Sequence, residues 1–433
     1  MKISELKNHF EEEIEVSGFV DNIRNLQWVI FLILRDKTGK VQITIEKSEE
    51  ENKKLIEIVN NLTLESTIKV KGKITQNEKV KLNAMEILPY TIEVTSKSLG
   101  ELPINIKDKD AQEIDTRLDN RFLDLRNEYN RNIFEIQSAM IKYMREFLYN
   151  NNFVEIHTPK LIATASESGS EVFEVKYFDR KAYLAQSPQF YKQMAMASGF
   201  ERIFEVGPVF RAENSNTNRH TTEFTGFDLE FSYINSVDDV MDMEEDLLCY
   251  TLEKLKESHG ELIDTYAKLE LPTCKFPRIK LHDLYDELEK RYGYKVPESA
   301  KVDLTTEAEK LAYKYAMEEY NCEFIFVTDY PKDKRAFYHL RKDGIPQGYD
   351  LIWRGVEITT GAQREHRYEE LKKQAEEKGL KKDVEFYLDF FKYGCPPHGG
   401  FGLGVDRLTM LLLNLPSLKE SMFIFRGPNR LNP

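Results

Sequence analysis

The sequence lacks the features of a membrane protein and of a disulfide-stabilised one. No apolar run in its 433 residues approaches the roughly 20 needed to cross a bilayer, and its first residues, Met-Lys-Ile-Ser-Glu, contain no apolar core of a signal peptide. The four cysteines lie far apart and form no CxxC pair. That spacing argues against a zinc site or a disulfide framework. We therefore expect a cytoplasmic protein with no membrane contact.

The sequence also lacks the common nucleotide-binding fingerprints and an excess of positive charge. It contains no GxxxxGK[ST] segment and no strand–GxGxxG–helix unit, so neither a P-loop nor a dinucleotide fold is predicted. The formal net charge is -13, which does not favour a general nucleic-acid binder. A local basic surface can nevertheless hold a phosphate backbone. The length exceeds one simple core, so two or more domains are expected.

Strand-like segments dominate the first part of the chain. Residues 41–45 alternate between apolar and polar side chains, and a polar helix is predicted over 48–61. Strands, one helix and further strands within 98 residues are typical of an OB-fold β-barrel over 1–98. Lys69, Lys71 and Lys73 occupy one face of a predicted strand. That face fits a solvated edge strand and a nucleic-acid surface equally well.

The remainder of the chain reads as a hinge followed by a larger domain. Residues 99–122 are polar and contain the breakers Gly100 and Pro103. Residues 123–433 alternate amphipathic helices with adjacent strand-like runs, and a helical insertion is expected around 236–335. This order predicts an α+β domain with a mainly antiparallel sheet flanked by helices.

Two segments carry the strongest chemical signal. In Phe210-Arg-Ala-Glu213 and the following strand 223–230, an arginine fork can hold a phosphate, a glutamate can accept from an exocyclic amine, and Phe224 can stack on a purine. Taken singly, each residue has an ordinary structural alternative. The second segment is the glycine-rich run from His398 to Arg407, where glycines permit close backbone approach to a ligand and the arginine begins a helix.

These segments resemble motifs 2 and 3 of the class II aminoacyl-tRNA synthetases, and residues 154–160 resemble motif 1. In that class the motif 1 proline, here Pro159, lies at the interface of a homodimer. An OB-fold barrel before the catalytic domain is the layout of the subgroup for aspartate, asparagine and lysine. Within it the chain is most similar to the aspartyl-tRNA synthetases of the archaeal and eukaryotic type. The resemblance implies activation of aspartate with ATP and its transfer to tRNA(Asp), and leaves open whether tRNA(Asn) is also charged.

The resemblance also implies roles for individual residues. The ATP-binding set is expected to be Arg211, Glu213, Arg219, His220, Phe224, Glu357 and Arg407, with Arg211 and Arg407 as the catalytic arginines. Asp350 and Glu357 match the carboxylates that bind Mg²⁺, a hard cation that prefers oxygen ligands. The aspartate-binding set is expected to be Glu167, Ser187, Gln189, Lys192, Asp228, Thr360 and Arg364. In the barrel, Phe31 matches a position that stacks on an anticodon base, and Gln42 one that reads a base edge.

Two departures and two rival interpretations accompany this reading. The family often carries a glycine pair where this chain has Gln27-Trp28, and the C-terminal tail is atypical at Phe425 and Gly427. One rival is an asparaginyl-tRNA synthetase, against which Lys192 and the segment 226–230 speak. The other is a catalytically silent paralogue that binds only RNA or a partner. The second is disfavoured by the joint presence of Arg211, Glu213, Asp350, Glu357 and Arg407.

Overall fold

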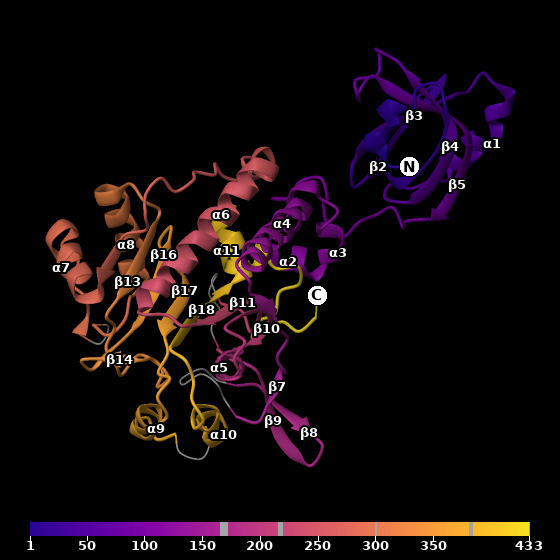
Figure 1. Cartoon of the computed structure of the whole chain (residues 1–433). Coiled ribbons are helices and arrows are strands. Elements are labelled where there is room, and N and C mark those ends of the chain that lie inside the picture. The colour runs from indigo at the N-terminus through magenta and orange to yellow at the C-terminus, as the bar shows by residue number, and fades with distance from the viewer. Residues whose placement is uncertain (165–171, 215–219, 299–300, 381–383, 433) are drawn as a thin grey trace. The chain divides into compact units, whose positions relative to one another are not determined.

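A computed structural model describes residues 1–164, 172–214, 220–298, 301–380 and 384–432. The chain divides into two compact units, Met1–Ala111 and Gln112–Pro433 (Figure 1). Among the helices of the described residues, none combines the length and apolar character that a membrane crossing requires.

The first unit is a closed five-stranded barrel in the order β1-β2-β3-β5-β4, closed by pairing of β4 with β1. The alternation is clearest in β2, where Ile30, Leu32 and Leu34 point inward and are fully buried, as the period of two in a strand requires. Gly18 lies where an added Cβ would sit 2.4 Å from the carbonyl oxygen of Arg35, so the barrel closes tightly only with glycine there. The elements are η1 (Ile3–Asn8), β1 (Glu13–Asn25), β2 (Val29–Asp36), β3 (Gly39–Glu46), η2 (Glu50–Asn52), α1 (Lys53–Asn60), β4 (Thr67–Gln76) and β5 (Met85–Ser96).

The second unit is built on an eight-stranded sheet in the order β12-β13-β16-β17-β18-β11-β10-β6. Only the edge pairs β12–β13 and β10–β6 are parallel, and the other pairs are antiparallel. The sheet strands are β6 (Val154–Glu155), β10 (Arg202–Phe210), β11 (Glu223–Ser232), β12 (Arg278–Lys280), β13 (Phe324–Thr328), β16 (Gly348–Trp353), β17 (Val356–Gln363) and β18 (His398–Gly404). Smaller strands are β7 (Leu161–Ile162), β8 (Glu174–Tyr177), β9 (Arg180–Leu184), β14 (Arg341–Lys342) and β15 (Ile345–Pro346).

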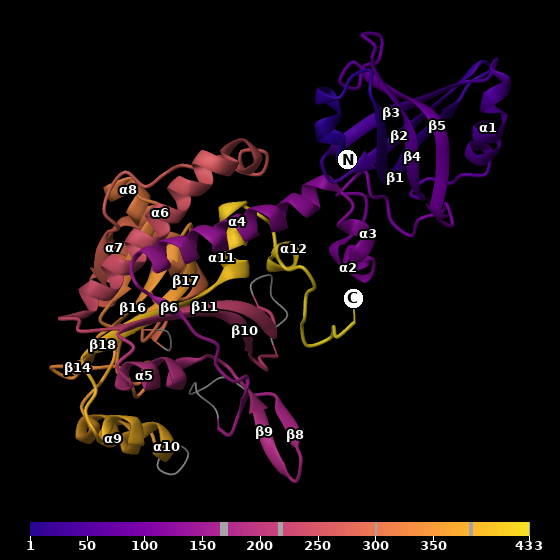
Figure 2. The ribbon, with the colours of Figure 1, turned by 45° about the vertical axis from the view of Figure 1, so that its right-hand side comes forward.

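Helices cover the sheet unequally. In Figures 1 and 2, α4, α6 and α11 lie on one face, whereas α5 lies on the other. The helices are α2 (Ile114–Asp119), α3 (Arg121–Asp124), α4 (Glu128–Asn150), α5 (Gln189–Ala197), α6 (Val237–Ile263), α7 (Leu281–Tyr292), α8 (Thr306–Tyr320), α9 (Tyr368–Glu377), α10 (Glu385–Leu388), η4 (Asp389–Phe391), α11 (Val405–Leu412) and α12 (Leu418–Ser421).

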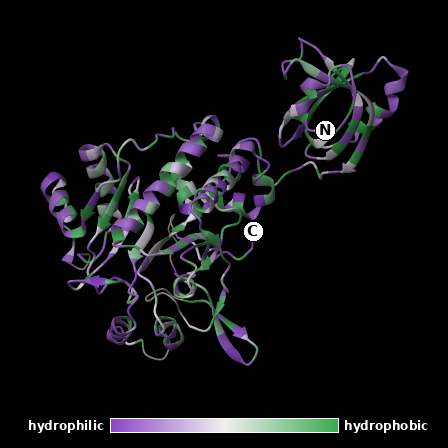
Figure 3. Ribbon diagram, in the orientation of Figure 1, coloured by the Kyte–Doolittle hydropathy of each residue, from purple (hydrophilic) through white to green (hydrophobic). Residues whose placement is uncertain are grey.

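The main core of this unit lies between the sheet and the α4/α6/α11 layer. Apolar side chains from α4, α6 and the strands form one cluster that includes Phe227, Leu229 and Phe401. Figure 3 shows this pattern, with hydrophobic sheet strands and helices that turn hydrophilic faces outward. Because side chains alternate along a strand, the same strands direct polar residues to the opposite face. That face carries the site described next.

The fold class predicted from the sequence is confirmed: an OB-fold barrel precedes an α+β unit with a mainly antiparallel sheet flanked by helices. The expected hinge over 99–122 contains α2 and the start of α3, and the second unit begins at Gln112. The expected helical insertion around 236–335 contains α6, α7 and α8. It also supplies β12 and β13, two strands at one edge of the main sheet.

Candidate active site

A cavity of about 420 Å³ opens on the polar face of the sheet, within the usual range for a small-molecule site. Its walls come from β10, β11, β17, β18, α5 and the start of α11. The sequence-predicted residues that line it are Arg211, Glu213, His220, Phe224, Ser187, Gln189, Lys192, Asp228, Glu357, Thr360, Arg364 and Arg407. Residues far apart in the chain therefore meet at this cavity. Glu167 and Arg219 lie outside the described residues.

One end of the cavity combines an arginine, an aromatic ring and an acid. The Arg211 guanidinium carbon lies 5.4 Å from the centroid of the Phe224 ring, and Arg211 Nε is buried without a hydrogen-bond partner among the described residues. An unsatisfied buried donor fits an anionic ligand, because leaving it unpaired is unfavourable. Glu213 approaches His220, with 4.0 Å between the carboxylate and Nε2. Arg407 donates from Nη1 to the backbone oxygen of Glu357 at 2.8 Å, which directs its side chain across β17.

The other end contains a buried cluster of two cations and two acids. Lys192 Nζ lies 3.0 Å from Asp228 Oδ1 and 3.5 Å from Glu230 Oε2. Arg364 Nε donates to Glu230 Oε1 at 2.9 Å, and its Nη2 donates to the Gly400 carbonyl, also at 2.9 Å. Burial alone would raise the pKa of Glu230, but the charges of Arg364 and Lys192 outweigh it and lower the pKa. Glu230 is therefore ionised and holds both cations beside the cavity.

The glycines of β18 make room for these acids. Asp228 lies opposite Gly402, and Glu230 lies opposite Gly400. A Cβ at Gly402 would lie 2.6 Å from Asp228 Oδ1, and one at Gly400 would lie 2.4 Å from Glu230 Oε2. The sequence suggested that the glycine run admits a ligand. In the structure, these two glycines admit the protein's own buried carboxylates.

A hydrogen-bonded chain holds Gln189 at the cavity wall. Gln193 Oε1 accepts from Gln189 Nε2 at 2.8 Å and from the Tyr387 hydroxyl at 2.9 Å. The Gln193 amide nitrogen lies 3.0 Å from His398 Nε2, and the other ring nitrogen of His398 lies 2.9 Å from the Pro396 carbonyl. Burial lowers the pKa of His398 to about 4, so the ring is neutral near pH 7. In the neutral ring, Nδ1 donates to the Pro396 carbonyl and Nε2 accepts from the Gln193 amide. These two bonds fix the donor and acceptor roles along the whole series of hydrogen bonds.

Two carboxylates meet between β16 and β17. The Thr360 hydroxyl contacts Asp350 Oδ1 at 2.9 Å and Glu357 Oε1 at 3.2 Å. Burial and the charge of Asp350 raise the pKa of Glu357 to about 7. Two buried carboxylates repel each other when both are ionised, and a hard divalent cation bound to their oxygens would relieve that repulsion. The donor set therefore fits Mg²⁺.

Arg335 was missed by the sequence analysis. Its guanidinium binds both oxygens of Asp350, at 3.0 and 2.8 Å, and is itself almost fully buried. Its carbon also lies 3.7 Å from the centre of the Tyr330 ring. In the sequence it ends the charged run Lys332-Asp-Lys-Arg335, which reads as a surface loop. No local pattern distinguishes the one member of that run that enters the site.

Four of the predicted residues that the structure describes are not among those that line the cavity: Asp350, Pro159, Phe31 and Gln42. Pro159 is exposed in the loop after β6, between Thr158 and Lys160, whose side chains both bind Glu205. In the barrel, Phe31 is half-buried on the outer face of β2. Gln42 is buried on β3, and its amide donates to Thr44.

The three lysines of β4 are paired with glutamates. Lys69 and Lys71 approach Glu15, Lys69 also approaches Glu93, and Lys73 lies 2.6 Å from Glu11. Each of these lysines therefore has an acidic neighbour on the barrel surface.

Comparison with known families identifies the class. The family described as tRNA synthetases class II (D, K and N) matches residues 113–425, and the OB-fold nucleic acid binding domain matches residues 14–96. The chain therefore belongs to the class II tRNA synthetases of this group.

Relatives narrow the assignment further. The chain is 41% identical to the aspartate–tRNA(Asp) ligase of Pyrococcus furiosus over 99% of this chain and 100% of the relative. It is 43% identical to the aspartate–tRNA(Asp/Asn) ligase of Methanopyrus kandleri over 98% and 96% of the two chains. Within its class, the chain is thus a member of the aspartate–tRNA ligase family.

This chain shares its fold with solved synthetases for asparagine and for aspartate. The asparaginyl-tRNA synthetase of Pyrococcus horikoshii, complexed with asparaginyl-adenylate, superposes with a TM-score of 0.89 at 31% identity, covering 100% of this chain and 99% of that one. The aspartyl-tRNA synthetase of Entamoeba histolytica gives 0.87 at 33% identity, with 100% and 92% coverage. The fold alone therefore does not choose between aspartate and asparagine, and that choice rests on the residues of the cavity.

Proposed function

We propose that this protein activates L-aspartate with ATP to aspartyl-adenylate and transfers the aspartyl group to the 3′ end of tRNA(Asp). The observation that carries the proposal is the pair of buried cations, Lys192 and Arg364, held at one end of the cavity by Glu230. The end with Arg211 and Phe224 suits a nucleotide. A cavity that has both of these ends can hold an adenine nucleotide next to a small acidic molecule.

Charge balance supports aspartate over asparagine. Lys192 and Arg364 are balanced in the structure by Asp228 and Glu230. When the ammonium group of an amino acid joins Asp228, Lys192 loses that partner and can turn to a side-chain carboxylate. An asparagine amide would leave this buried positive charge uncompensated, which costs several kcal/mol. Since about 1.4 kcal/mol corresponds to a factor of ten, the expected preference for aspartate is at least hundredfold.

The reaction requires positioning and charge stabilisation, with no protein nucleophile. The aspartate α-carboxylate attacks the α-phosphorus of ATP in line, and pyrophosphate leaves. The terminal hydroxyl of the tRNA then attacks the acyl carbon of the adenylate and loses its proton, the mixed anhydride breaks, and AMP leaves. Arg211 would hold the α-phosphate and Arg407 the terminal phosphate. Glu213 and Phe224 would hold the adenine, with His220 near the outer phosphates. Fixed cations around a transferring phosphoryl group stabilise its developing charge.

Asp350 and Glu357 would hold Mg²⁺, with Thr360 orienting both carboxylates and Arg335 holding Asp350 in place. The ion supplies charge neutralisation for the phosphates of ATP. Gln189, Ser187 and Thr360 complete the proposed aspartate site.

A homodimer and a cytoplasmic setting also belong to the proposal. Pro159 is exposed beside β6, whose Val154 is exposed as well, and α4 carries the exposed aromatic Tyr149. Exposed apolar side chains gathered on one region are typical of an interface with another chain. Size-exclusion chromatography with light scattering would give the mass in solution, and a monomer at micromolar concentration would contradict the dimer.

Amino-acid-dependent ATP–pyrophosphate exchange tests the enzymatic proposal. Exchange is expected with aspartate and at least a hundredfold less with asparagine. Exchange with asparagine alone would overturn the aspartate assignment, and no exchange with either would favour a protein that only binds RNA. Charging of purified tRNA(Asp) and tRNA(Asn) with aspartate then decides whether the product is aspartyl-tRNA(Asp) alone or both.

A further inference from the structure

The tip of the β1–β2 hairpin presents a large aromatic side chain to solvent. Trp28 is 72% exposed and its neighbour Leu26 is 51% exposed. The turn is nevertheless well held. Leu26 N–H donates to the Val29 carbonyl at 3.0 Å, Lys47 N–H donates to the Trp28 carbonyl at 3.0 Å, and Lys47 Nζ donates to the Leu26 carbonyl at 2.7 Å. An exposed indole on a fixed backbone contributes little to the barrel core and is accessible to a ligand.

Trp28 lies in the turn directly before β2, the strand that carries Phe31. Ile30 and Leu32 point into the barrel and are fully buried, whereas Phe31 lies on the outer face between Arg24 of β1 and Thr44 of β3. The Arg24 guanidinium carbon lies 5.7 Å from the Phe31 ring. Three residues along a strand span roughly 10 Å, which is about three base steps of a stacked single strand. Trp28 lies outside the strand, so the alternation that places Phe31 on the outer face does not set its direction, and one RNA loop can present different bases to the two rings.

On the hairpin side of the barrel, cations lie beside the exposed aromatics, together with the exposed Glu46 of β3, which is opposite Val29. The lysines of β4 are paired with Glu11, Glu15 and Glu93, so that face brings acids as well as bases toward any phosphate. On the hairpin side, Arg24 packs on Phe31, and the Lys47 ammonium binds the turn carbonyl of Leu26. Cations beside exposed aromatics are the combination that single-stranded nucleic acid recognition uses.

We propose that Trp28 is a second base-stacking side chain of the barrel, which takes an unpaired base of the tRNA anticodon loop while Phe31 takes another. The proposal rests on the tRNA-charging function proposed above.

Tryptophan fluorescence of the full chain tests the contact directly. The chain has two tryptophans, and Trp353 is 1% exposed in the core, stacked on Phe324 with 5.0 Å between ring centroids. Exposed Trp28 therefore reports on the hairpin. Titration with tRNA(Asp), or with an RNA hairpin of its anticodon arm, should quench this emission and protect it from acrylamide. The change should be absent in Trp28→Phe. If filter binding shows that the protein is saturated with tRNA and the emission is still unchanged, the proposal is overturned.

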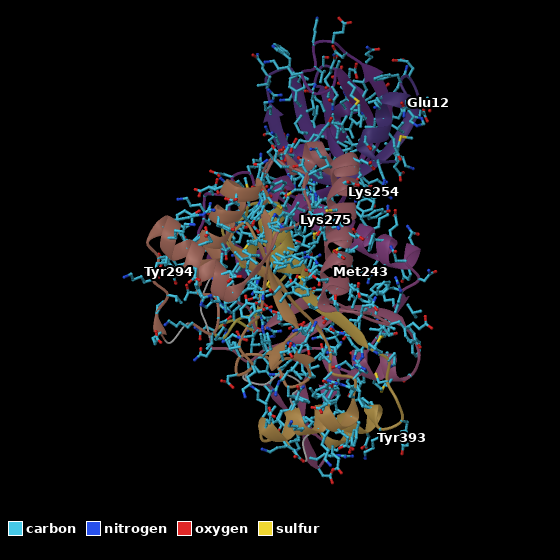
Figure 4. The ribbon with its side chains drawn as sticks, turned by 60° about the vertical axis from the view of Figure 1, so that its left-hand side comes forward. Glu12, Met243, Lys254, Lys275, Tyr294 and Tyr393 are labelled. Carbon is cyan, nitrogen blue, oxygen red and sulfur yellow. The ribbon has the colours of Figure 1, made fainter. Side chains whose placement is uncertain are left out.

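Aminoacylation kinetics give a second test. Trp28→Ala should raise the KM for tRNA(Asp) roughly tenfold or more, because a stacked base contributes about a factor of 5 to 150. Trp28→Phe, which keeps an aromatic face, should recover most of the loss. Tyr393→Ala is the matched control, because Tyr393 is also exposed, at 94%, and lies in the other unit (Figure 4).

The outcomes separate the two proposals. Absence of aspartate-dependent ATP–pyrophosphate exchange in the wild-type enzyme would refute the enzymatic function, since that reaction needs no tRNA. Normal exchange with an unchanged KM for tRNA in Trp28→Ala would refute only the role of Trp28. Equal losses in Trp28→Ala and Trp28→Phe would refute stacking as its mechanism.

Discussion

Replacing Glu244 by glutamine should make the catalytic unit progressively more stable than the wild type as the pH rises from 4 to 8. Glu244 lies on α6, fully buried against the sheet, and its Oε2 accepts a 2.7 Å hydrogen bond from the Tyr349 hydroxyl. Burial raises the pKa of this carboxyl from 4.5 to about 7. The residue adjoining Tyr349 is Asp350, so Glu244 supports the strand of the proposed metal site from behind.

The size of the effect follows from the linkage of folding to protonation. A carboxyl whose pKa is raised on folding stabilises the folded state below its unfolded pKa, and this contribution is lost as the pH rises through the folded value. The window therefore runs from about 4.5 to about 7. Each tenfold change in proton affinity is worth about 1.4 kcal/mol, so ionisation of Glu244 costs about 3 kcal/mol above that window. Glutamine keeps an acceptor for Tyr349 and does not ionise.

Urea unfolding at a series of pH values measures the difference. In a Trp28→Phe background, the emission of Trp353 reports on the catalytic unit alone. Glu253→Gln, an exposed position on the same helix, is the control and should show no such trend. Glu357 also has a raised pKa, but it is present in both proteins and its contribution cancels. A difference in unfolding free energy that stays flat from pH 4 to pH 8 would refute the reasoning.

Three further predictions concern the cavity. Lys192→Met should lower kcat/KM for aspartate in pyrophosphate exchange by about a hundredfold to a thousandfold, because it removes the buried cation proposed to receive the aspartate side chain. ATP binding measured by calorimetry should change little, and unaltered aspartate kinetics would contradict the pocket assignment. Gly402→Ala should raise the KM for aspartate at least tenfold, because the new Cβ would lie 2.6 Å from Asp228; an equal rise in Gly404→Ala, which has no contact closer than 3.7 Å, would argue against a local cause. Arg335→Met should lower the free energy of unfolding by about 3 kcal/mol, because it leaves the buried Asp350 carboxylate without its guanidinium partner. Mg²⁺ with ATP should then raise the melting temperature of the variant more than that of the wild type. An equal rise in both proteins would show that no cation replaces the guanidinium.

The sequence by itself determined the two-part organisation and most of the cavity wall. Alternation over short segments predicts the barrel, because a strand has a period of two. The segments 210–213 and 398–407 identify the class, because their residue types and spacing match motifs 2 and 3. Within a single strand, spacing also decides orientation. Phe224 and Asp228 differ by an even number, so they point to one face, and both line the cavity.

Only the tertiary structure decided which charges meet and what the glycines are for. Arg335 and Asp350, 15 residues apart, form a buried bidentate pair that no local pattern marks. Glu230 becomes the shared partner of Lys192 and Arg364 because three separate elements converge on it. Pairing across strands and burial set these energies, and both depend on neighbours distant in the chain. The spacing of residues in the sequence shows which functional groups are present. Burial and strand register decide which of these groups pair and how much their charges cost in free energy.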